Sequence, residues 1–251
     1  MPTKSYLYTP GPTPVPPQVT AAMNRPMIGH RSQEFANLHG EIVEKAKTVF
    51  QTANDLYVLT TSGTGGMETA IANTVAPGDR VLALVTGNFG ERFAKIASAY
   101  GAVVTRLEFP WGTAFDMEQV TETWEKEGPF KLVLATHNET STGVTNDIAS
   151  LGNYLKDTEA LLLVDAVSSM GAMDIRTDEW HVDIMVTGSQ KALMLPPGLA
   201  LVSVSSKAWP IIEANGGVRF YFSLLEARKS FAKQNTPWTP AVALFYGLDA
   251  A

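Results

Sequence analysis

The chain has 251 residues, of which 45% are hydrophobic and 18% are charged, so it can bury a substantial core as one large domain or two small ones. Its 25 acidic and 19 basic residues give a net charge of −6 without a basic block, which argues against nucleic acid and anionic membranes as main partners. No cysteine is present, which excludes disulfides, thiolate nucleophiles and cysteine metal sites; we expect a cytoplasmic protein.

The N-terminal segment lacks the apolar core of a signal peptide, and no stretch approaches the roughly 20 apolar residues that span a bilayer. Residues 9–17, TPGPTPVPP, carry so many prolines that they predict an extended arm rather than a helix. We therefore assign residues 1–18 to a proline-rich arm that lies across a surface and can reach another subunit. A helix is predicted over residues 34–50, where apolar residues recur at helical spacing after Ser32.

The rest of the chain alternates between strand and helix patterns. Apolar segments predict strands at residues 56–60, 81–86, 103–109, 131–136, 161–164, 184–187 and 199–204. Helices are predicted at residues 67–75, 91–100, 117–127 and 148–156, with a last one near 241–248. Wholly apolar strands separated by helices indicate an α/β domain with a largely parallel sheet covered on both faces. Ligands of such sheets bind beyond the carboxyl ends of the strands.

The first loop of interest is TSGTGGME, residues 61–68, where glycines and hydroxyl side chains lead directly into a helix. Backbone amides there, with the helix dipole behind them, suit a phosphate group. The loop lacks the lysine of a P-loop, and Glu68 stands where a dinucleotide fingerprint has its third glycine. A phosphate cradle and a plain glycine turn both fit this loop.

Two further loops follow strands. GNFGER, residues 87–92, places Phe89 where it can stack on a flat heteroaromatic ring, although a core position explains it as well. THNETSTG, residues 136–143, is polar enough to bind a ligand or to form a solvated turn. His137 in this loop fits a structural role better than a catalytic one.

Asp165 ends the wholly apolar segment LLLVD, where a carboxylate is costly unless it meets a cation or several donors. A helix cap or an ion pair explains it, and so does a carboxylate that keeps a pyridine nitrogen protonated. DIMVTGSQKALMLPPG, residues 183–198, places Lys191 just after another buried strand. Burial favours the neutral amine, which can form a Schiff base with a carbonyl, whereas an ordinary lysine keeps its head in solvent.

Together, a phosphate cradle, an aromatic ring, a carboxylate and a buried lysine are the parts needed to hold pyridoxal 5′-phosphate. The sequence also resembles the class V aminotransferases of fold type I, most closely the alanine–glyoxylate and serine–pyruvate aminotransferases. The shared segments run in family order over nearly all of the chain: PGPTPVPP with MIGHRS, SGTGGME, THNETSTGV, LLLVDAVSSMG, GSQKALMLPPG and TPWTPAV. This resemblance implies a three-layer αβα large domain with a mainly parallel sheet of about seven strands.

The resemblance also assigns roles around the cofactor ring. Lys191 would form the Schiff base and Asp165 would pair with the pyridine nitrogen. Val167 would pack under the ring, and Phe89 would stack on its other face, where many relatives carry tryptophan.

Other positions are assigned to the phosphate group and the substrate. The residues that would bind phosphate from the same subunit are Thr64, Gly65, Gly66 and Gln190. Thr140 would lie near the phenolic oxygen or the substrate, and Gly29 would line the substrate pocket. The family forms a homodimer with shared sites, in which Thr236 and Thr239 would bind the phosphate of the partner subunit. No metal ligand is predicted.

Members of the family continue into a smaller C-terminal domain that supplies an arginine for the substrate carboxylate. No residue here matches that arginine, and nothing in the sequence favours Arg31 or Arg219 for the role. We therefore expect residues 19–251 to form the cofactor-binding large domain of a longer protein whose small domain is missing.

The expected activity is transfer of an amino group from alanine or serine to a 2-oxo acid such as glyoxylate or pyruvate. Lys191 would move the α-proton of the amino acid while Asp165 steadies the protonated ring. A lyase of the same fold is one alternative, although a desulfurase would need a cysteine that the chain lacks. A non-catalytic fragment or subunit that binds the cofactor without turnover is the other.

Overall fold

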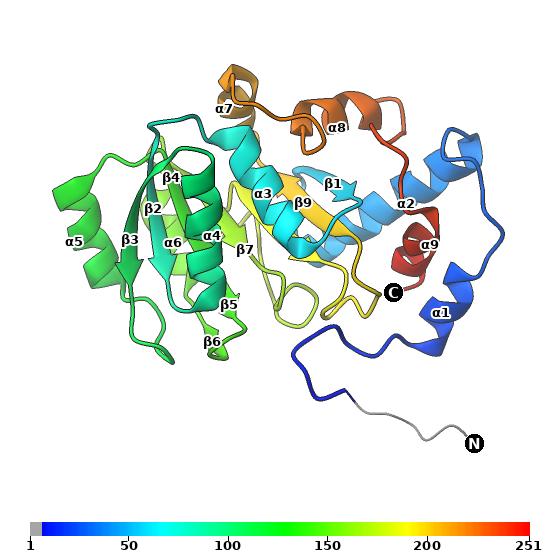
Figure 1. Cartoon of the computed structure of the whole chain (residues 1–251), viewed down its shortest axis with the longest axis horizontal. Coiled ribbons are helices and arrows are strands. Elements are labelled where there is room, and N and C mark those ends of the chain that lie inside the picture. The colour runs from blue at the N-terminus through cyan, green and yellow to red at the C-terminus, as the bar shows by residue number, and fades with distance from the viewer. Residues whose placement is uncertain (1–6) are drawn as a thin grey trace.

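The chain folds around one large sheet, which Figure 1 shows with helices packed along it. A computed structural model describes residues 7–251. Within them the large sheet has the strand order β1-β9-β8-β7-β4-β2-β3. The strands are β1 Asp55–Leu59, β2 Arg80–Val85, β3 Val103–Glu108, β4 Leu132–Thr136, β7 Leu161–Asp165, β8 Ile184–Gly188 and β9 Ala200–Val204. A separate two-stranded ribbon consists of β5 Asn138–Glu139 and β6 Val144–Thr145.

The large sheet is mainly parallel. β2 pairs in parallel with β3 and β4, and β7 pairs in parallel with β4 and β8. Within the described sheet only β9 runs against its neighbours β1 and β8. The prediction of about seven strands in a mainly parallel sheet is therefore confirmed, with strand ends that differ from the predicted ones by a residue at most.

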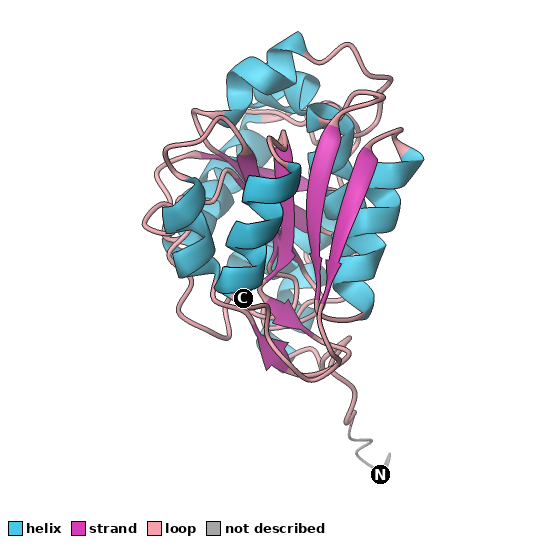
Figure 2. Ribbon diagram, turned by 90° about the vertical axis from the view of Figure 1, so that its left-hand side faces the viewer, coloured by secondary structure: helices cyan, strands magenta, loops and turns pink. Residues whose placement is uncertain are grey.

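Helices cover both faces of this sheet, as Figure 2 shows. The helices are α1 Pro17–Met23, α2 Gln33–Phe50, α3 Gly63–Thr74, α4 Asn88–Ala99, α5 Met117–Glu127, α6 Ile148–Leu155, α7 Ala208–Ala214, α8 Leu224–Phe231 and α9 Val242–Ala250. One buried core joins the sheet to α2, α5, α6 and α9, and a second joins it to α3, α4, α7 and α8. The predicted three-layer αβα architecture is confirmed.

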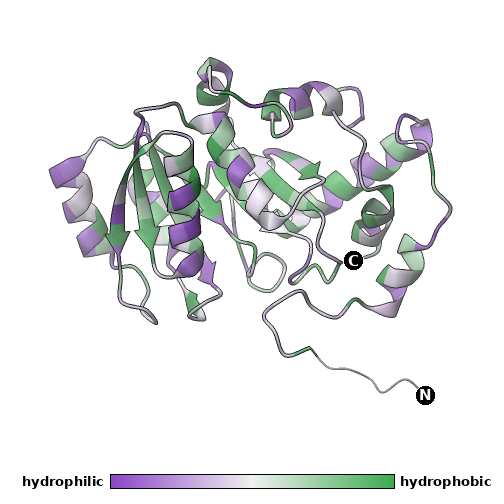
Figure 3. Cartoon of the chain, viewed as in Figure 1, coloured by the Kyte–Doolittle hydropathy of each residue, from purple (hydrophilic) through white to green (hydrophobic). Residues whose placement is uncertain are grey.

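The hydropathy of the elements explains the layers. Figure 3 shows strands that are mostly apolar and helices that carry polar residues. Every residue of β7 and β8 is buried. Neighbouring strand residues point to opposite faces, so Leu82 joins the first core and Ala83 joins the second. A strand with a core on each side must be apolar throughout, which is the pattern in the sequence.

Two helices begin three or four residues earlier than predicted, and both changes involve ligand loops. α3 begins at Gly63 rather than near residue 67, and the Ser62 Oγ accepts a hydrogen bond from Gly65 N at 3.4 Å. α4 begins at Asn88 rather than near residue 91, so Phe89 lies in its first turn. Glycine disfavours helix by propensity alone, and here packing against the sheet decides where the helix starts.

Three short helices were not predicted. α1 has seven residues and begins inside the proline-rich segment, where proline is compatible with a first helical turn. α7 also has seven residues, and Pro210 lies in its first turn, which allows the helix although proline reads as a breaker. α8 has eight residues with only two buried, so its apolar pattern is weak.

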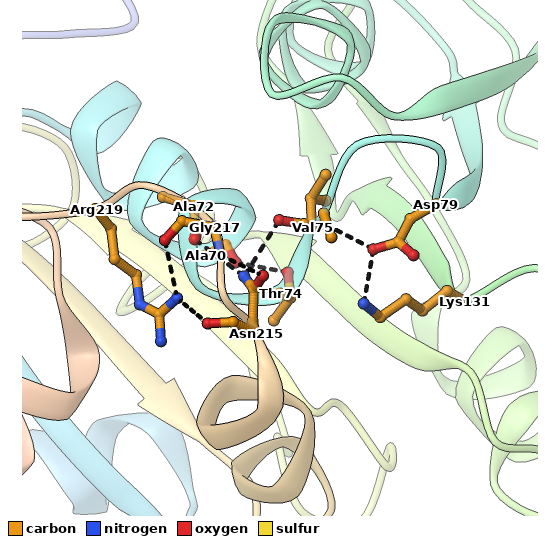
Figure 4. Close-up of polar contacts among 10 residues, drawn as sticks. Ala70, Ala72, Thr74, Val75, Asp79, Lys131, Asn215, Gly217 and Arg219 are labelled. Carbon is orange, nitrogen blue, oxygen red and sulfur yellow. Dashed lines mark hydrogen bonds and ion pairs between the residues drawn. The ribbon is translucent and has the colours of Figure 1, made fainter.

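The far end of α3 is tied to the segment after α7 (Figure 4). Asn215 Nδ2 donates to Ala72 O at 3.3 Å and to Val75 O at 3.1 Å. Ala72 belongs to the last turn of α3, where carbonyls lack partners inside the helix. Arg219 in turn donates to the Asn215 carbonyl at 2.6 Å. These bonds anchor the end of α3 that lies opposite the glycine-rich loop.

No helix within residues 7–251 is long and apolar enough to cross a membrane, and no described group of three or more His, Cys, Asp or Glu could hold a metal ion. Residues 7–16 of the predicted arm contain neither helix nor strand, while residues 1–6 lie outside the described part. The division at residue 18 between arm and large domain stays a prediction.

Candidate active site

Five strands bring the predicted ligand loops to one edge of the sheet. β1, β2, β4, β7 and β8 run in the same direction, so their carboxyl ends lie together. A cavity of about 220 Å³ lies among residues that follow four of these strands and the N-terminal arm. The predicted site residues that line it are Thr64, Phe89, Asp165, Val167, Gln190 and Lys191.

Lys191 lies in a turn after β8 that hydrogen bonds hold in place. Ser189 N donates to Leu199 O at 2.9 Å, and Ser189 Oγ donates to Pro196 O at 2.7 Å. The Lys191 side chain is buried, with 9% of the residue exposed. This burial lowers the pKa of the Lys191 ammonium, and the Asp165 carboxylate opposes that shift. A lysine with a lowered pKa yields the neutral amine more easily, as the predicted chemistry requires.

Asp165 closes β7, is buried, and lines the same cavity as Lys191 and Arg92. Burial raises the pKa of its carboxyl to about 6, while a hydrogen bond from Val167 N favours the charged form. That bond measures 2.9 Å and ends on Asp165 Oδ1. An uncompensated carboxylate in this position is unfavourable, so a cationic partner in the cavity would stabilise its charged form.

The N-terminus of α3 borders the same cavity through Ser62, Gly63 and Thr64. A Cβ built on Gly63 would lie 2.8 Å from Val167 Cγ2, so a side chain there would displace Val167. Gly65 and Gly66 belong to the first turn of α3 and are buried outside the cavity lining, where Gly65 N donates to Ser62 Oγ at 3.4 Å and Gly66 N donates to Ser62 O at 3.0 Å. Their predicted role in binding phosphate through backbone amides stays a prediction.

Arg92 was missed by the sequence analysis and also lines the cavity. Its guanidinium lies 4.6 Å from the centroid of the Phe89 ring, and its Nη1 donates to Thr64 Oγ1 at 3.2 Å. Phe89 and Arg92 are three positions apart, which places them on one helix face. The sequence analysis did not use this helical spacing, because it predicted that the helix begins after Phe89.

The N-terminal arm packs against the lysine of its own chain. Thr13 N donates to Gln190 O at 3.0 Å, and Thr13 Oγ1 donates to Lys191 O at 3.0 Å. Gly11 and Pro12 line the cavity, and a Cβ built on Gly11 would lie 2.5 Å from Lys191 Cδ. The arm was predicted to lie across a surface, and that surface is the active-site edge of its own chain. Contact of the arm with another subunit stays a prediction.

Besides Gly65 and Gly66, four predicted residues do not line the Lys191 cavity. Thr140 forms a short hydrogen bond with Ser168 Oγ at the same edge of the sheet. Thr236 and Thr239 line a separate small cavity, together with residues such as Trp238. Gly29 lies exposed between α1 and α2, and a Cβ built on it would meet nothing within 4 Å.

His137 and the two arginines considered from sequence have structural partners. His137 is buried, its Nδ1 lies 2.8 Å from Ser169 Oγ, and burial lowers its pKa to about 4. Arg31 donates to Thr236 O at 2.6 Å, and Arg219 donates to Ile212 O at 2.9 Å. None of the three lines the cavity around Lys191.

Known proteins match this chain in sequence and structure. It is 48% identical to an uncharacterized aminotransferase of Methanocaldococcus jannaschii over 250 residues, which cover 99% of this chain and 65% of that protein. It is 42% identical to the L-aspartate–glyoxylate aminotransferase of Paracoccus denitrificans over 256 residues, covering 100% of this chain and 65% of the relative. The chain thus spans about 65% of the length of these curated relatives.

The crystal structure of alanine–glyoxylate aminotransferase from Nostoc sp. superposes with a TM-score of 0.94 at 33% identity, covering 99% of this chain and 68% of the other. The family model for aminotransferase class-V matches residues 5–251. These matches confirm the resemblance noted from the sequence motifs. The chain therefore belongs to the class-V aminotransferase family.

Proposed function

We propose that the whole protein is a pyridoxal 5′-phosphate-dependent aminotransferase. It moves an amino group from a small amino acid, alanine or serine, to a 2-oxo acid such as glyoxylate or pyruvate. The observation that carries this proposal is the shared cavity of Lys191, Asp165 and the N-terminus of α3. Relatives named as glyoxylate aminotransferases support the choice of acceptor.

The residues present fit the cofactor. Gln190 lines the cavity, and its Nε2 group can donate a hydrogen bond to a phosphate oxygen, whereas its buried and unpartnered Oε1 can only accept one. The start of α3 supplies backbone N–H groups that an anion can satisfy. The residues that would hold the phosphate are Thr64, Gly65, Gly66 and Gln190.

Four residues would contact the cofactor ring. Val167 and Phe89 would cover its two faces, and both line the cavity. A protonated pyridine nitrogen would give the buried Asp165 carboxylate its cationic partner. Thr140 would lie near the phenolic oxygen or the substrate.

When bound, the cofactor supplies an electron sink for the pair released when the Cα–H bond of the amino acid breaks. Lys191 then acts as the base that takes the α-proton from the substrate and later returns a proton. Its lowered pKa keeps the Nζ able to accept that proton. Gly11 and Pro12 line the cavity beside the lysine.

The protein is further proposed to act as a homodimer with shared sites. Thr236 and Thr239 would bind phosphate in the partner subunit, and Gly29 would line a substrate pocket. Their separation from the cavity of their own chain supports this role. So does an exposed aromatic group nearby, since Phe220 is 75% exposed and stacks on Trp238 with ring centroids 4.6 Å apart. A cytoplasmic location is part of the same proposal.

The test uses the protein incubated with pyridoxal 5′-phosphate, alanine or serine, and glyoxylate. An aminotransferase converts equal amounts of amino acid and glyoxylate into a 2-oxo acid and glycine without releasing ammonia. A lyase would release ammonia from serine instead. A protein that binds the cofactor with neither conversion would support the non-catalytic alternative, and Lys191→Ala is the control that should remove any conversion.

A further inference from the structure

Glu139 is a buried carboxylate with no assigned role. It belongs to β5, in the loop region after β4, and its side chain is fully enclosed. Oε1 accepts hydrogen bonds from Ser141 N at 3.1 Å and from Ser141 Oγ at 2.6 Å. A buried charge is tolerated only when such donors compensate it, so the position is built around the carboxylate.

The other oxygen of Glu139 binds the start of α4. Oε2 accepts from Phe89 N at 3.0 Å and from Gly90 N at 3.1 Å. Ser141 Oγ accepts from Asn88 N at 3.0 Å. In Figure 1, β5 lies beside the end of α4 that these bonds join. Free N–H groups of a first helical turn are thus satisfied from a different loop, where negative charge also suits the helix dipole.

The helix cannot supply this cap itself. Its N-cap residue is Gly87, and no side-chain cap hydrogen bond is present. A Cβ built on Gly87 would lie 2.6 Å from Glu139 Cγ and 2.5 Å from Ser141 Oγ. The absence of a side chain at Gly87 therefore makes the room that Glu139 and Ser141 occupy.

The hydrogen bonds from the start of α4 to Glu139 and Ser141 fix the backbone of one residue that faces the Lys191 cavity. Phe89 carries one of the bonded N–H groups, and its ring lines the cavity under the Arg92 guanidinium. An aromatic ring stacks well only in a restricted range of distance and tilt, so freedom in its backbone weakens the contact. Fixing the peptide of Phe89 fixes the plane against which a flat ligand can stack.

We propose that Glu139 is a positioning residue that holds Phe89 against the cofactor ring through the first turn of α4. This inference rests on the proposed function. It predicts that loss of the carboxylate weakens cofactor binding by acting through Phe89. A carboxylate that only stabilised the fold would affect cofactor affinity equally with and without the Phe89 ring.

The experiment is a double-mutant cycle with Glu139→Gln and Phe89→Ala, in which absorbance titration gives the pyridoxal 5′-phosphate affinity and visible circular dichroism reports its seating. Loss of a bond to a charged group predicts that E139Q weakens affinity about tenfold and reduces the dichroism. In the Phe89→Ala background the same change should alter affinity less than about twofold. Equal effects in both backgrounds, or none in either, would overturn the proposal.

Asp183→Asn is the matched control. Asp183 is also a buried carboxylate, and it accepts from Leu162 N at 2.9 Å and from Ser205 Oγ at 2.8 Å, away from the Lys191 cavity. Asp183→Asn should lower the thermal midpoint and leave cofactor affinity and dichroism unchanged.

If E139Q does not fold, Ser141→Ala replaces it in the cycle and is judged by the same coupling to Phe89. Failure of the unmodified protein to bind pyridoxal 5′-phosphate would refute the proposed function, and this inference with it.

Discussion

The contact between Gly11 and Lys191 makes a sharp prediction for Gly11→Ala. A Cβ at position 11 would lie 2.5 Å from Lys191 Cδ and 2.9 Å from Cε, which is too close for both atoms, and 3.1 Å from Nζ, which is a tight contact. Either the arm must withdraw or the lysine must move. The cheaper of these two responses decides what the substitution does.

Withdrawal of the arm would break two hydrogen bonds of 3.0 Å, from Thr13 N to Gln190 O and from Thr13 Oγ1 to Lys191 O, and a third of 3.5 Å from Thr13 Oγ1 to Gln190 O. At about 0.5–1.5 kcal/mol for each of the two shorter bonds, this response costs at least about 1–3 kcal/mol. Turning the lysine away from its preferred rotamer costs about 0.5–1.5 kcal/mol. The lysine should therefore yield, so stability falls by less than about 1.5 kcal/mol while Nζ leaves its position.

The assay combines urea unfolding with the rate at which pyridoxal 5′-phosphate absorbance develops after mixing. Gly11→Ala should keep nearly all its stability and bind the cofactor covalently at least about tenfold more slowly, as expected when an amine is displaced from a reactive position. Thr13→Val is the control, because it removes the side-chain hydrogen bonds of the arm to Lys191 O and Gln190 O without adding an atom toward Lys191. An unchanged rate for Gly11→Ala would refute the reasoning.

Two further predictions concern stability. His39 is buried with both ring nitrogens unpartnered, and burial lowers its pKa from 6.5 to about 4, so the unfolded chain takes up a proton that the folded protein does not and stability falls as pH falls from 6.5 toward 4. His39→Phe should therefore raise the free energy of unfolding by about 1–3 kcal/mol and reduce its loss at low pH, as measured by urea unfolding at pH 7 and pH 5. An equal loss of stability between these pH values in the variant and the unmodified protein would contradict this prediction. Gly66→Ala places a Cβ 2.7 Å from Val186 Cγ1 and 3.0 Å from Ala200 Cβ, so it should cost about 1–3 kcal/mol, whereas Gly40→Ala, which meets nothing within 4 Å, should cost nothing in the same assay.

Periodicity predicted the layers well because the sheet is buried on both faces. A strand such as β7, with all five residues buried, must be apolar throughout, and that pattern is visible in one dimension. The order of the strands and the opposite direction of β9 depend on contacts far apart in the sequence, which apolar patterns alone do not encode. Short helices such as α7 were missed because seven residues give too few repeats to detect.

Residues of the candidate site could be predicted where their type was unusual for the local sequence around them. Asp165 and Lys191 stand out because charged groups at the ends of apolar strands need an explanation. Arg92 was missed because its alignment with Phe89 depends on where α4 begins. Glu139 was hidden inside a polar loop, since only the folded chain brings it to the amides of Phe89 and Gly90.

The most direct test of the account asks which residue binds the cofactor covalently. The protein is incubated with pyridoxal 5′-phosphate, reduced with borohydride, digested and mapped by mass spectrometry. We expect one stoichiometric label, on the peptide that contains Lys191, and none on that peptide after Lys191→Ala. Stoichiometric label on another lysine, or no label on the unmodified protein, would contradict the assignment of the buried lysine and with it the proposed function.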